Sequence, residues 1–207
     1  MPHPNWRFTA LLVADLLLVF VTPPVLSDYE LPPFVGSLVA LLATAGTIAL
    51  VSDRRAVQVG VIGILPLAAA LHALPAPETT TSALQAAFAA LVTLFVGRAV
   101  FSRGEVDMHR IAGGIALYLN VSLAFAASYV FLSDISPAAF SGLTQDHVHR
   151  IQDMVHFSLT TLTTLGYGDI LPRSPVARSM ADLEALIGQL FPATLLARLV
   201  GLLISRR

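Results

Sequence analysis

The sequence predicts an all-α membrane protein, and two observations carry that prediction. Of its 207 residues, 56% are hydrophobic and 12% are charged, and the mean hydropathy is +0.76. A water-soluble domain could not cover so apolar a composition with polar surface. The apolar residues also gather in stretches of about 20 residues, the length that a helix needs to cross the hydrocarbon core. These stretches are residues 8–26, 34–52, 56–75, 82–102, 111–133 and 177–205.

Residue types that are missing exclude several kinds of site. The chain has no cysteine and no lysine, so all twelve basic residues are arginine. A disulfide framework and a thiolate metal site are therefore excluded. No nucleophile, base and orienting group fall together in a pattern typical of catalysis, so we expect neither an enzyme nor a bound cofactor. We also expect no nucleic-acid partner, no cleaved signal peptide before the first span and no soluble regulatory domain.

The positions of arginine predict how the chain is oriented in the membrane. Short cytoplasmic loops carry an excess of basic residues. Most arginines fall in loops that alternating spans place on one side, which we assign as cytoplasmic together with both termini. The cytoplasmic set is Arg7, Arg54, Arg55, Arg98, Arg103, Arg110, Arg206 and Arg207, and the exceptions are Arg150, Arg173 and Arg178.

The segment between the last two spans, residues 134–176, does not fit a spanning helix. Its amphipathic stretch, about 146–163, is too short and too polar to span alone, and a glycine-rich turn follows it. A segment that enters and leaves on the same side fits better. Such backbone is tolerated in a membrane only where protein or a water-filled pore surrounds it. We therefore expect a re-entrant helix followed by a loop.

The loop carries the motif Thr164-Leu165-Gly166-Tyr167-Gly168-Asp169. A dehydrated potassium ion needs oxygen atoms in place of its water shell, and the carbonyls of residues 164–167 with the Thr164 hydroxyl can supply them. Carbonyls that point the same way require positive φ at alternating positions, which Gly166 and Gly168 adopt at little steric cost. The motif resembles the filter signature of the potassium-channel family, from which Leu165 departs because valine is commoner there.

The resemblance implies a complete pore over the second half of the chain. Four copies would surround one pore in a bacterial-type inner membrane, in contact with lipids, with potassium bound by Thr164, Leu165, Gly166 and Tyr167. Each copy would have a peripheral domain of four helices over residues 1–107 and a pore domain over 108–207. The pore domain would comprise an outer helix at 111–133, a pore helix at about 146–163, a filter at 164–169 and an inner helix at about 177–205.

Three residues of the sixth span are candidates for gating and for the cavity wall. Gly188 lies nineteen positions beyond Asp169, where the family's inner helix carries its hinge glycine. Pro192 could add a second kink because it removes a backbone donor. Gln189 is the candidate for the cavity wall. The alternative for Gly188 is that it only permits close helix packing.

Four residues before the filter are candidates for its support. His156 and Phe157 occupy positions where family members place bracing aromatics, and Thr160, before Thr163, falls where some members have an acid. His156 is then positioned to form a hydrogen bond with Asp169. Because histidine titrates near neutral pH, we hypothesise that His156 couples outer pH to the stability of the filter. The alternative is that His156 is only a polar side chain at the solvated entrance of the pore.

The start of the pore helix admits two further interpretations. His149, Asp153 and His156 share one face, which could indicate a divalent metal site. We favour solvated polar residues, whose acids raise the local concentration of cations.

Charged residues inside the spans predict weak voltage dependence. The fourth span contains only Arg98, whereas steep gating needs several charges. Asp15 in the first span could pair with Arg98, because an unpaired ion in hydrocarbon is costly. Glu184 is expected to form a hydrogen bond with a pore-helix hydroxyl. Arg198 either rings the cytoplasmic exit or reaches the interface on its long stem.

The function expected from these observations is passive, potassium-selective conduction without steep voltage gating. A secondary transporter would need paired discontinuous helices and an internal repeat, and neither is visible in the sequence. The remaining alternative is a non-conducting or weakly selective subunit, or an ion sensor, that keeps the same fold.

Overall fold

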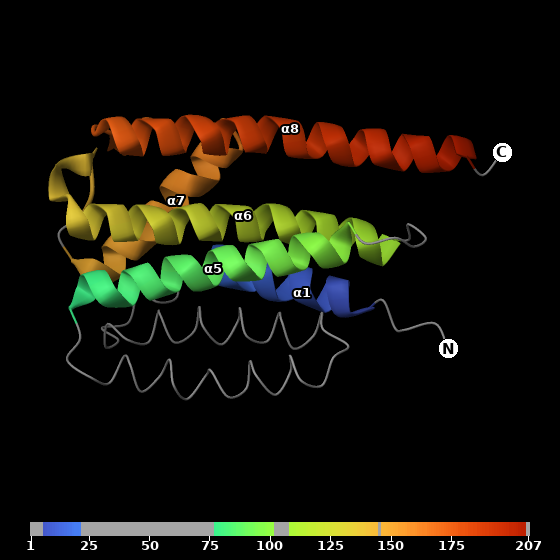
Figure 1. The fold of residues 1–207 in the computed structure, drawn as a ribbon, viewed down its shortest axis with the longest axis horizontal. Coiled ribbons are helices and arrows are strands. Elements are labelled where there is room, and N and C mark those ends of the chain that lie inside the picture. Colours follow the sequence, from blue (N-terminus) through green and yellow to red (C-terminus); the bar gives the residue numbers. More distant parts are fainter. Residues whose placement is uncertain (1–5, 22–76, 102–107, 145, 206–207) are drawn as a thin grey trace.

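The computed structural model describes residues 6–21, 77–101, 108–144 and 146–205, which are almost entirely helical (Figure 1). The long helices are α5 (Glu78–Val100), α6 (Met108–Ile135) and α8 (Pro175–Ser205). The shorter ones are α1 (Trp6–Leu16), continued by the π-helical turn η1 (Leu17–Val21), and α7 (His147–Leu162). The predicted spans 34–52 and 56–75 lie outside the described residues.

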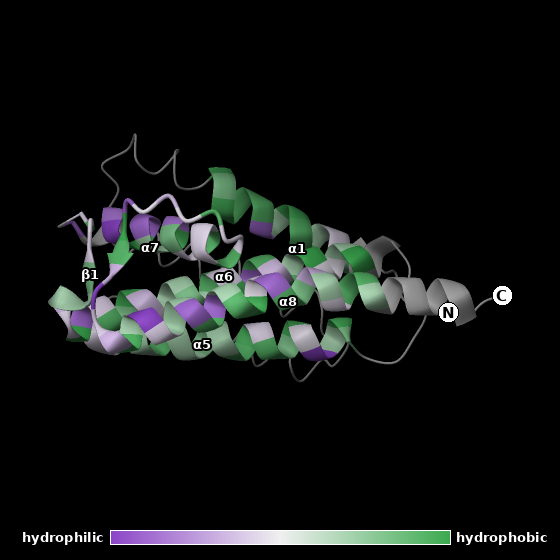
Figure 2. Ribbon diagram, turned by 90° about the horizontal axis from the view of Figure 1, so that it is seen from above, coloured by the Kyte–Doolittle hydropathy of each residue, from purple (hydrophilic) through white to green (hydrophobic). Residues whose placement is uncertain are grey.

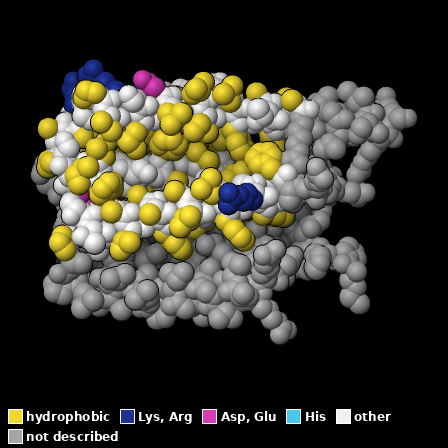
Figure 3. All heavy atoms as spheres, viewed as in Figure 1, with side chains coloured by type: hydrophobic (Ala, Val, Ile, Leu, Met, Phe, Trp, Pro, Cys, Tyr) yellow, Lys and Arg dark blue, Asp and Glu magenta, His cyan; other side chains and the backbone are white. Residues whose placement is uncertain are grey.

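Three of the described helices are long and apolar enough to cross a membrane. They are Thr79–Val100, Ile111–Ile135 and Pro175–Ala197, and a shorter apolar helix covers Phe8–Val21. These segments overlap the fourth, fifth, sixth and first predicted spans, so the all-α membrane fold is confirmed. The described helices are mostly hydrophobic, with hydrophilic residues gathered where α7 begins (Figure 2). Hydrophobic side chains also cover much of the face drawn in Figure 3.

Helices α1, α5 and α6 share one core. Helix α6 packs against both α5 and α1, so it is the centre of this part of the molecule. The core is built from aliphatic side chains at helical spacing, since residues three to four apart lie on the same helix face. Its buried members are Leu11, Val92, Val96, Val100, Ala116 and Leu117.

Helix α7 is too short to span; it runs obliquely behind α6 in Figure 1 and packs against both α6 and α8. Its 16 residues measure about 24 Å, against about 30 Å for the hydrocarbon core. Asp146 caps its start, because the carboxylate accepts a hydrogen bond from the His149 backbone N–H at 3.2 Å. The apolar residues Met154 and Leu162 of α7 are fully buried. Residues 163–169, which follow the helix, are exposed.

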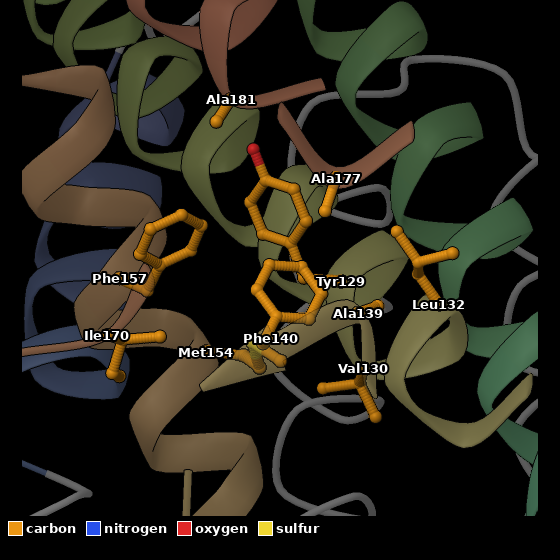
Figure 4. Close-up of a cluster of buried hydrophobic side chains, with 10 residues drawn as sticks. All are labelled: Tyr129, Val130, Leu132, Ala139, Phe140, Met154, Phe157, Ile170, Ala177 and Ala181. Atoms are coloured by element: carbon orange, nitrogen blue, oxygen red, sulfur yellow. The ribbon is translucent and has the colours of Figure 1, made fainter. Parts of the chain in front are cut away.

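A second core holds α7 against α6 and α8. Tyr129, Phe140 and Phe157 form a triangle of edge-to-face rings, with centroids 5.1–5.7 Å apart (Figure 4). Such geometry adds about 0.5–1.5 kcal/mol per pair beyond the burial of area. Ala177 and Ala181 bring α8 close to this cluster because their side chains are small. The cluster therefore fixes the position of the re-entrant helix.

Two short strands join the segments on either side of α7. After the 3-10 turn η2 (Pro137–Ala139), strand β1 (Phe140–Ser141) pairs antiparallel with β2 (Leu171–Pro172). Gly142 follows with φ of +91°, and a Cβ there would lie 2.1 Å from the Asp169 carbonyl oxygen. Only glycine fits this approach. Helix α8 then begins with Pro175 at its first position, and the Ser174 hydroxyl accepts from the Ala177 N–H at 3.1 Å.

Candidate functional site

The predicted filter, residues 164–169, begins where α7 ends. The Thr160 carbonyl accepts hydrogen bonds from the backbone N–H groups of Leu165, at 2.8 Å, and Gly166, at 3.1 Å. The Thr164 N–H donates to the Thr161 carbonyl at 2.9 Å. These bonds turn the chain sharply out of the helix. Any displacement of the end of α7 must therefore move the filter as well.

Positive φ alternates along the filter. Gly166 and Gly168 have φ of +56° and +79°, which confirms the predicted backbone conformation at both glycines. Thr164 also has a positive φ, +58°, which the sequence did not predict. For a residue with a β-carbon this conformation costs about 1–2 kcal/mol. No atom lies within 4 Å of a Cβ built on either glycine, so conformation and not space requires glycine there.

The residues of the predicted filter are exposed in a single copy of the chain. Every residue from Thr163 to Asp169 is exposed, including 58% of Leu165 and 68% of Tyr167. Large apolar side chains of the filter are thus left uncovered within one copy. Leu183, Leu186, Leu190 and Leu196 of α8 are also each more than half exposed.

His156 of α7 contacts two residues of the predicted filter, Asp169 and Tyr167. Its Nε2 lies 3.1 Å from Asp169 Oδ2, so the expected hydrogen bond between these residues is present. Its ring also stacks on Tyr167, with centroids 5.6 Å apart and planes 11° from parallel. Both contacts are exposed to solvent. A change at His156 therefore acts on two filter residues at once.

The other predicted support residues act on the helix and not on the filter side chains. Phe157 belongs to the aromatic cluster, where it is buried. The Thr160 hydroxyl donates to the Phe157 carbonyl at 3.0 Å, and the Thr163 hydroxyl donates to the Leu159 carbonyl at 2.6 Å. Both threonines thus bond within their own helix.

Helix α8 meets the end of α7 and the start of the filter through neighbouring residues. A Cβ built on Gly188 would lie 1.8 Å from the Leu162 carbonyl oxygen, so the two helices approach as closely as glycine allows. Gln189 Nε2 donates to the Thr164 hydroxyl at 2.9 Å. Pro192 lies inside α8 and is exposed. The close contact supports the packing interpretation of Gly188, and its role as a hinge stays a prediction.

Comparison with known proteins finds similarity in the C-terminal part of the chain. A profile described as "Ion channel" matches residues 117–205, which contain α7, the filter and most of α6 and α8. The inward rectifier potassium channel Kirbac3.1 of Paramagnetospirillum magnetotacticum is 35% identical over 74 residues, and two-pore potassium channel 1 of Arabidopsis thaliana is 29% identical over 109. Residues 117–205 are thus similar to ion channels, and two of the matched relatives are named as potassium channels.

The similarity to these channels is confined to part of each protein. The match covers 36% of this chain and 23% of Kirbac3.1, and 52% of this chain and 27% of the Arabidopsis channel. Protein LctB of Bacillus caldotenax is 34% identical over 87 residues, which is 40% of this chain and 64% of LctB. The chain therefore spans less than two thirds of each of these relatives. No solved structure matches it.

Among the charged residues of the predicted spans, Asp15 has a partner other than the predicted one. Asp15 is buried and accepts a hydrogen bond from Asn120 Nδ2 at 2.7 Å, whereas Arg98 is exposed near the end of α5. The predicted Asp15–Arg98 pair is wrong for the described residues, because the two side chains do not meet. The Arg198 side chain lies outside what the structure describes.

Glu184 of α8 lies beside the pore helix, as predicted. It is fully buried, and the Ser158 hydroxyl of α7 is hydrogen bonded to its Oε1. The Tyr129 hydroxyl of α6 donates to its Oε2 at 2.7 Å. One carboxyl group thus joins three helices of the pore region.

The acids at the start of α7 have partners of their own. His149 Nδ1 lies 2.8 Å from Asp146 Oδ2, and Asp153 accepts two hydrogen bonds of 2.9 Å from Thr144. Among the described residues no three histidine, aspartate or glutamate side chains gather as a metal site would require. The geometry of this part of the chain thus gives no support to a site at His149, Asp153 and His156.

Several residues that fix the pore region escaped the sequence reasoning. Ser158 and Tyr129 look like ordinary helix residues until the tertiary contacts with Glu184 appear. Gly142 could have been noticed only as a glycine after a turn. Arg150, which the loop pattern left unexplained, forms an ion pair of 3.2 Å with the buried carboxylate of Asp134. That pair fastens α7 to the end of α6.

Proposed function

We propose that this chain is one subunit of a homotetrameric, potassium-selective channel of the inner membrane. Dehydrated potassium ions pass down their electrochemical gradient between the backbone carbonyls of Thr164, Leu165, Gly166 and Tyr167. The protein performs no covalent chemistry, and potassium is the permeant ligand. Two relatives whose names are those of potassium channels support this choice of ion.

The single observation that carries the proposal is the backbone of the filter. Positive φ at Thr164, Gly166 and Gly168 alternates with the intervening residues, as a ladder of carbonyls requires. The segment is held at the end of a helix that is too short to span, where irregular backbone needs a water-filled surrounding.

The exposure of the filter supports an assembly of four copies. One chain supplies carbonyl oxygens on one side of an ion, whereas a dehydrated ion needs oxygens on all sides. Leu165 and Tyr167 would gain cover from neighbouring subunits, since both are more than half exposed in one copy. The remaining apolar surface, such as Leu91 and Leu94 of α5, then faces lipid. Both termini are proposed to be cytoplasmic, from the arginine pattern.

We propose that the channel is not steeply voltage-gated. In the described part of the peripheral helices, α5 carries one arginine, Arg98, in its last turn. Each charge that crosses the whole field gains about 2.3 kcal/mol per 100 mV, so several per subunit are needed for steep gating. A conductance that rises steeply over about 100 mV would contradict this part of the proposal.

The test is the reversal potential of the purified protein in liposomes or planar bilayers, with potassium on one side and sodium on the other. A reversal close to the potassium equilibrium value is expected. Current that reverses near zero would favour the weakly selective subunit, and no current from correctly assembled protein would favour the non-conducting sensor.

A matched pair of glycine substitutions separates the filter from general packing. Gly166→Ala forces an L residue to adopt φ of +56°, at a cost of about 1–2 kcal/mol per subunit, without meeting any atom within 4 Å. We expect it to abolish potassium selectivity. Gly97→Ala in α5 makes the same chemical change where the new Cβ meets Leu117 at an ordinary 3.7 Å, so selectivity should stay unchanged.

A further inference from the structure

Glu184 belongs to a closed network of buried oxygen atoms. Besides its bond to Glu184, the Ser158 hydroxyl oxygen lies 2.7 Å from the Ser122 backbone carbonyl and 2.9 Å from the Ser122 hydroxyl. Tyr129 completes the network from α6, with its hydroxyl pointing out of the aromatic cluster towards Ala181 of α8 (Figure 4). Ser122, Ser158 and Glu184 have 0% exposure, so no water reaches them from the surface.

Counting hydrogen atoms assigns a proton to this carboxyl. The network has four oxygen–oxygen contacts: Tyr129 to Glu184, Glu184 to Ser158, and Ser158 to each of the two Ser122 oxygens. Each needs one hydrogen, because two oxygens at hydrogen-bond distance repel when neither donates. The three hydroxyl groups supply three hydrogens, and the carbonyl supplies none. The carboxyl group is the remaining group of the network that can carry the fourth.

A proton on Glu184 Oε1 satisfies every contact. Glu184 then donates to Ser158, Ser158 donates to the Ser122 carbonyl, the Ser122 hydroxyl donates to Ser158, and Tyr129 donates to Glu184 Oε2. Ser158 accepts two hydrogen bonds and donates one, which matches the capacity of a hydroxyl. An ionised carboxylate would leave one of the contacts to Ser158 without a hydrogen.

The surroundings favour the neutral form as well. A charge inside a membrane span is costly unless it is paired. In the described residues, Glu184 acts electrostatically on Tyr118 and Tyr129 of α6, and neither of these is basic. From α7 the contact comes from Ser158, and Asp182 of α8 is an exposed acid that acts on Tyr129. No cation in this part of the chain offsets a charge at Glu184.

We propose that Glu184 is a neutral carboxylic acid that acts as a positioning residue for the filter. It fastens the middle of α7 to both α6 and α8. Ser158 is one turn or less from Thr160, whose carbonyl holds Leu165 and Gly166, so a shift of α7 is carried directly to the filter. The inference rests on the proposed conduction of potassium.

The experiment compares three variants of the full chain in the potassium and sodium bilayer assay. Glu184→Gln keeps an N–H donor for Ser158 and an acceptor for Tyr129 but cannot ionise, so selectivity close to wild type is expected. Glu184→Leu removes both bonds and leaves buried hydroxyls unpaired, and we expect the potassium-to-sodium permeability ratio to fall by about tenfold or more. Gly97→Ala in α5, whose new Cβ would meet Leu117 at an ordinary 3.7 Å, is the control and should leave selectivity unchanged.

Infrared difference spectroscopy of wild type against Glu184→Gln reads the proton without any need for conduction. A carboxylic-acid C=O band that is present in wild type and lost in the variant is expected. A lost carboxylate band instead, or a Glu184→Gln channel as unselective as Glu184→Leu, would overturn the neutral assignment. Full selectivity in Glu184→Leu would overturn the positioning role.

Failure of the proposed function and failure of the inference on Glu184 give different results. If wild type conducts without selectivity, the proposed function fails while the infrared result still decides the protonation state. If Glu184→Leu does not assemble, Tyr129→Phe takes its place, because it removes one hydrogen bond and little volume. Reduced selectivity is then expected, and unchanged selectivity would contradict the inference.

Discussion

The contact between Gly188 and the end of α7 gives the sharpest prediction. A methyl group at Gly188 would lie 1.8 Å from the Leu162 carbonyl oxygen, whereas ordinary contacts begin at 3.4 Å. Gly188→Ala must therefore push α8 and α7 apart by about 1.6 Å locally, a distance that a well-packed region accommodates at about 1–3 kcal/mol or more per subunit.

The same displacement breaks the neighbouring hydrogen bond. Gln189 holds the Thr164 hydroxyl at 2.9 Å, and a separation larger by more than about 0.6 Å exceeds hydrogen-bond range. We therefore expect Gly188→Ala to lower the thermal stability of the assembled protein and to reduce potassium selectivity together. A pure hinge role would instead lower the open probability and leave both properties intact.

The assays are thermal unfolding of the detergent-purified assembly and the reversal potential in the bilayer. Gly97→Ala is the matched control, since its Cβ would meet Leu117 at 3.7 Å. Wild-type stability and selectivity in Gly188→Ala would refute the packing argument. Wild-type stability with rare openings would restore the hinge interpretation.

Three further outcomes follow from the described contacts. Gly142→Ala should destabilise the outer end of the filter and speed its loss of conduction, because a Cβ would lie 2.1 Å from the Asp169 carbonyl oxygen at φ of +91°; unchanged recordings would contradict that contact. His156→Phe keeps a ring against the filter but removes the bond to Asp169, so any response of the current to outer pH that this bond carries should be lost. A retained response would exclude His156 as the sensor. Asn120→Leu should lower the free energy of unfolding by about 1–3 kcal/mol, because the buried Asp15 carboxyl loses the Asn120 donor. Arg98→Ala should change it by less than about 0.5 kcal/mol. Equal losses in the two variants would favour the Asp15–Arg98 ion pair instead.

The sequence alone determined the class of the protein and predicted the location of its site. Hydrophobic stretches of spanning length follow from the thickness of a bilayer, so the fourth, fifth and sixth spans could be recognised without any structure. The filter is a local motif in which glycines permit positive φ, and Gly166 and Gly168 have it. The bonds of His156 to Asp169 and of Glu184 to a pore-helix hydroxyl followed from short spacing and from the cost of a lone charge.

Only the tertiary structure decided which residues meet across helices. Asp15 is bonded to Asn120 and not to Arg98, because the choice between two partners depends on how α1 is rotated against α6, which no spacing along the chain specifies. Gly188 faces the Leu162 carbonyl because α8 crosses the end of α7 at that residue. The neutral hydrogen-bond network of Glu184 needs side chains from three helices, and a sequence read along one dimension carries no information on where helices cross.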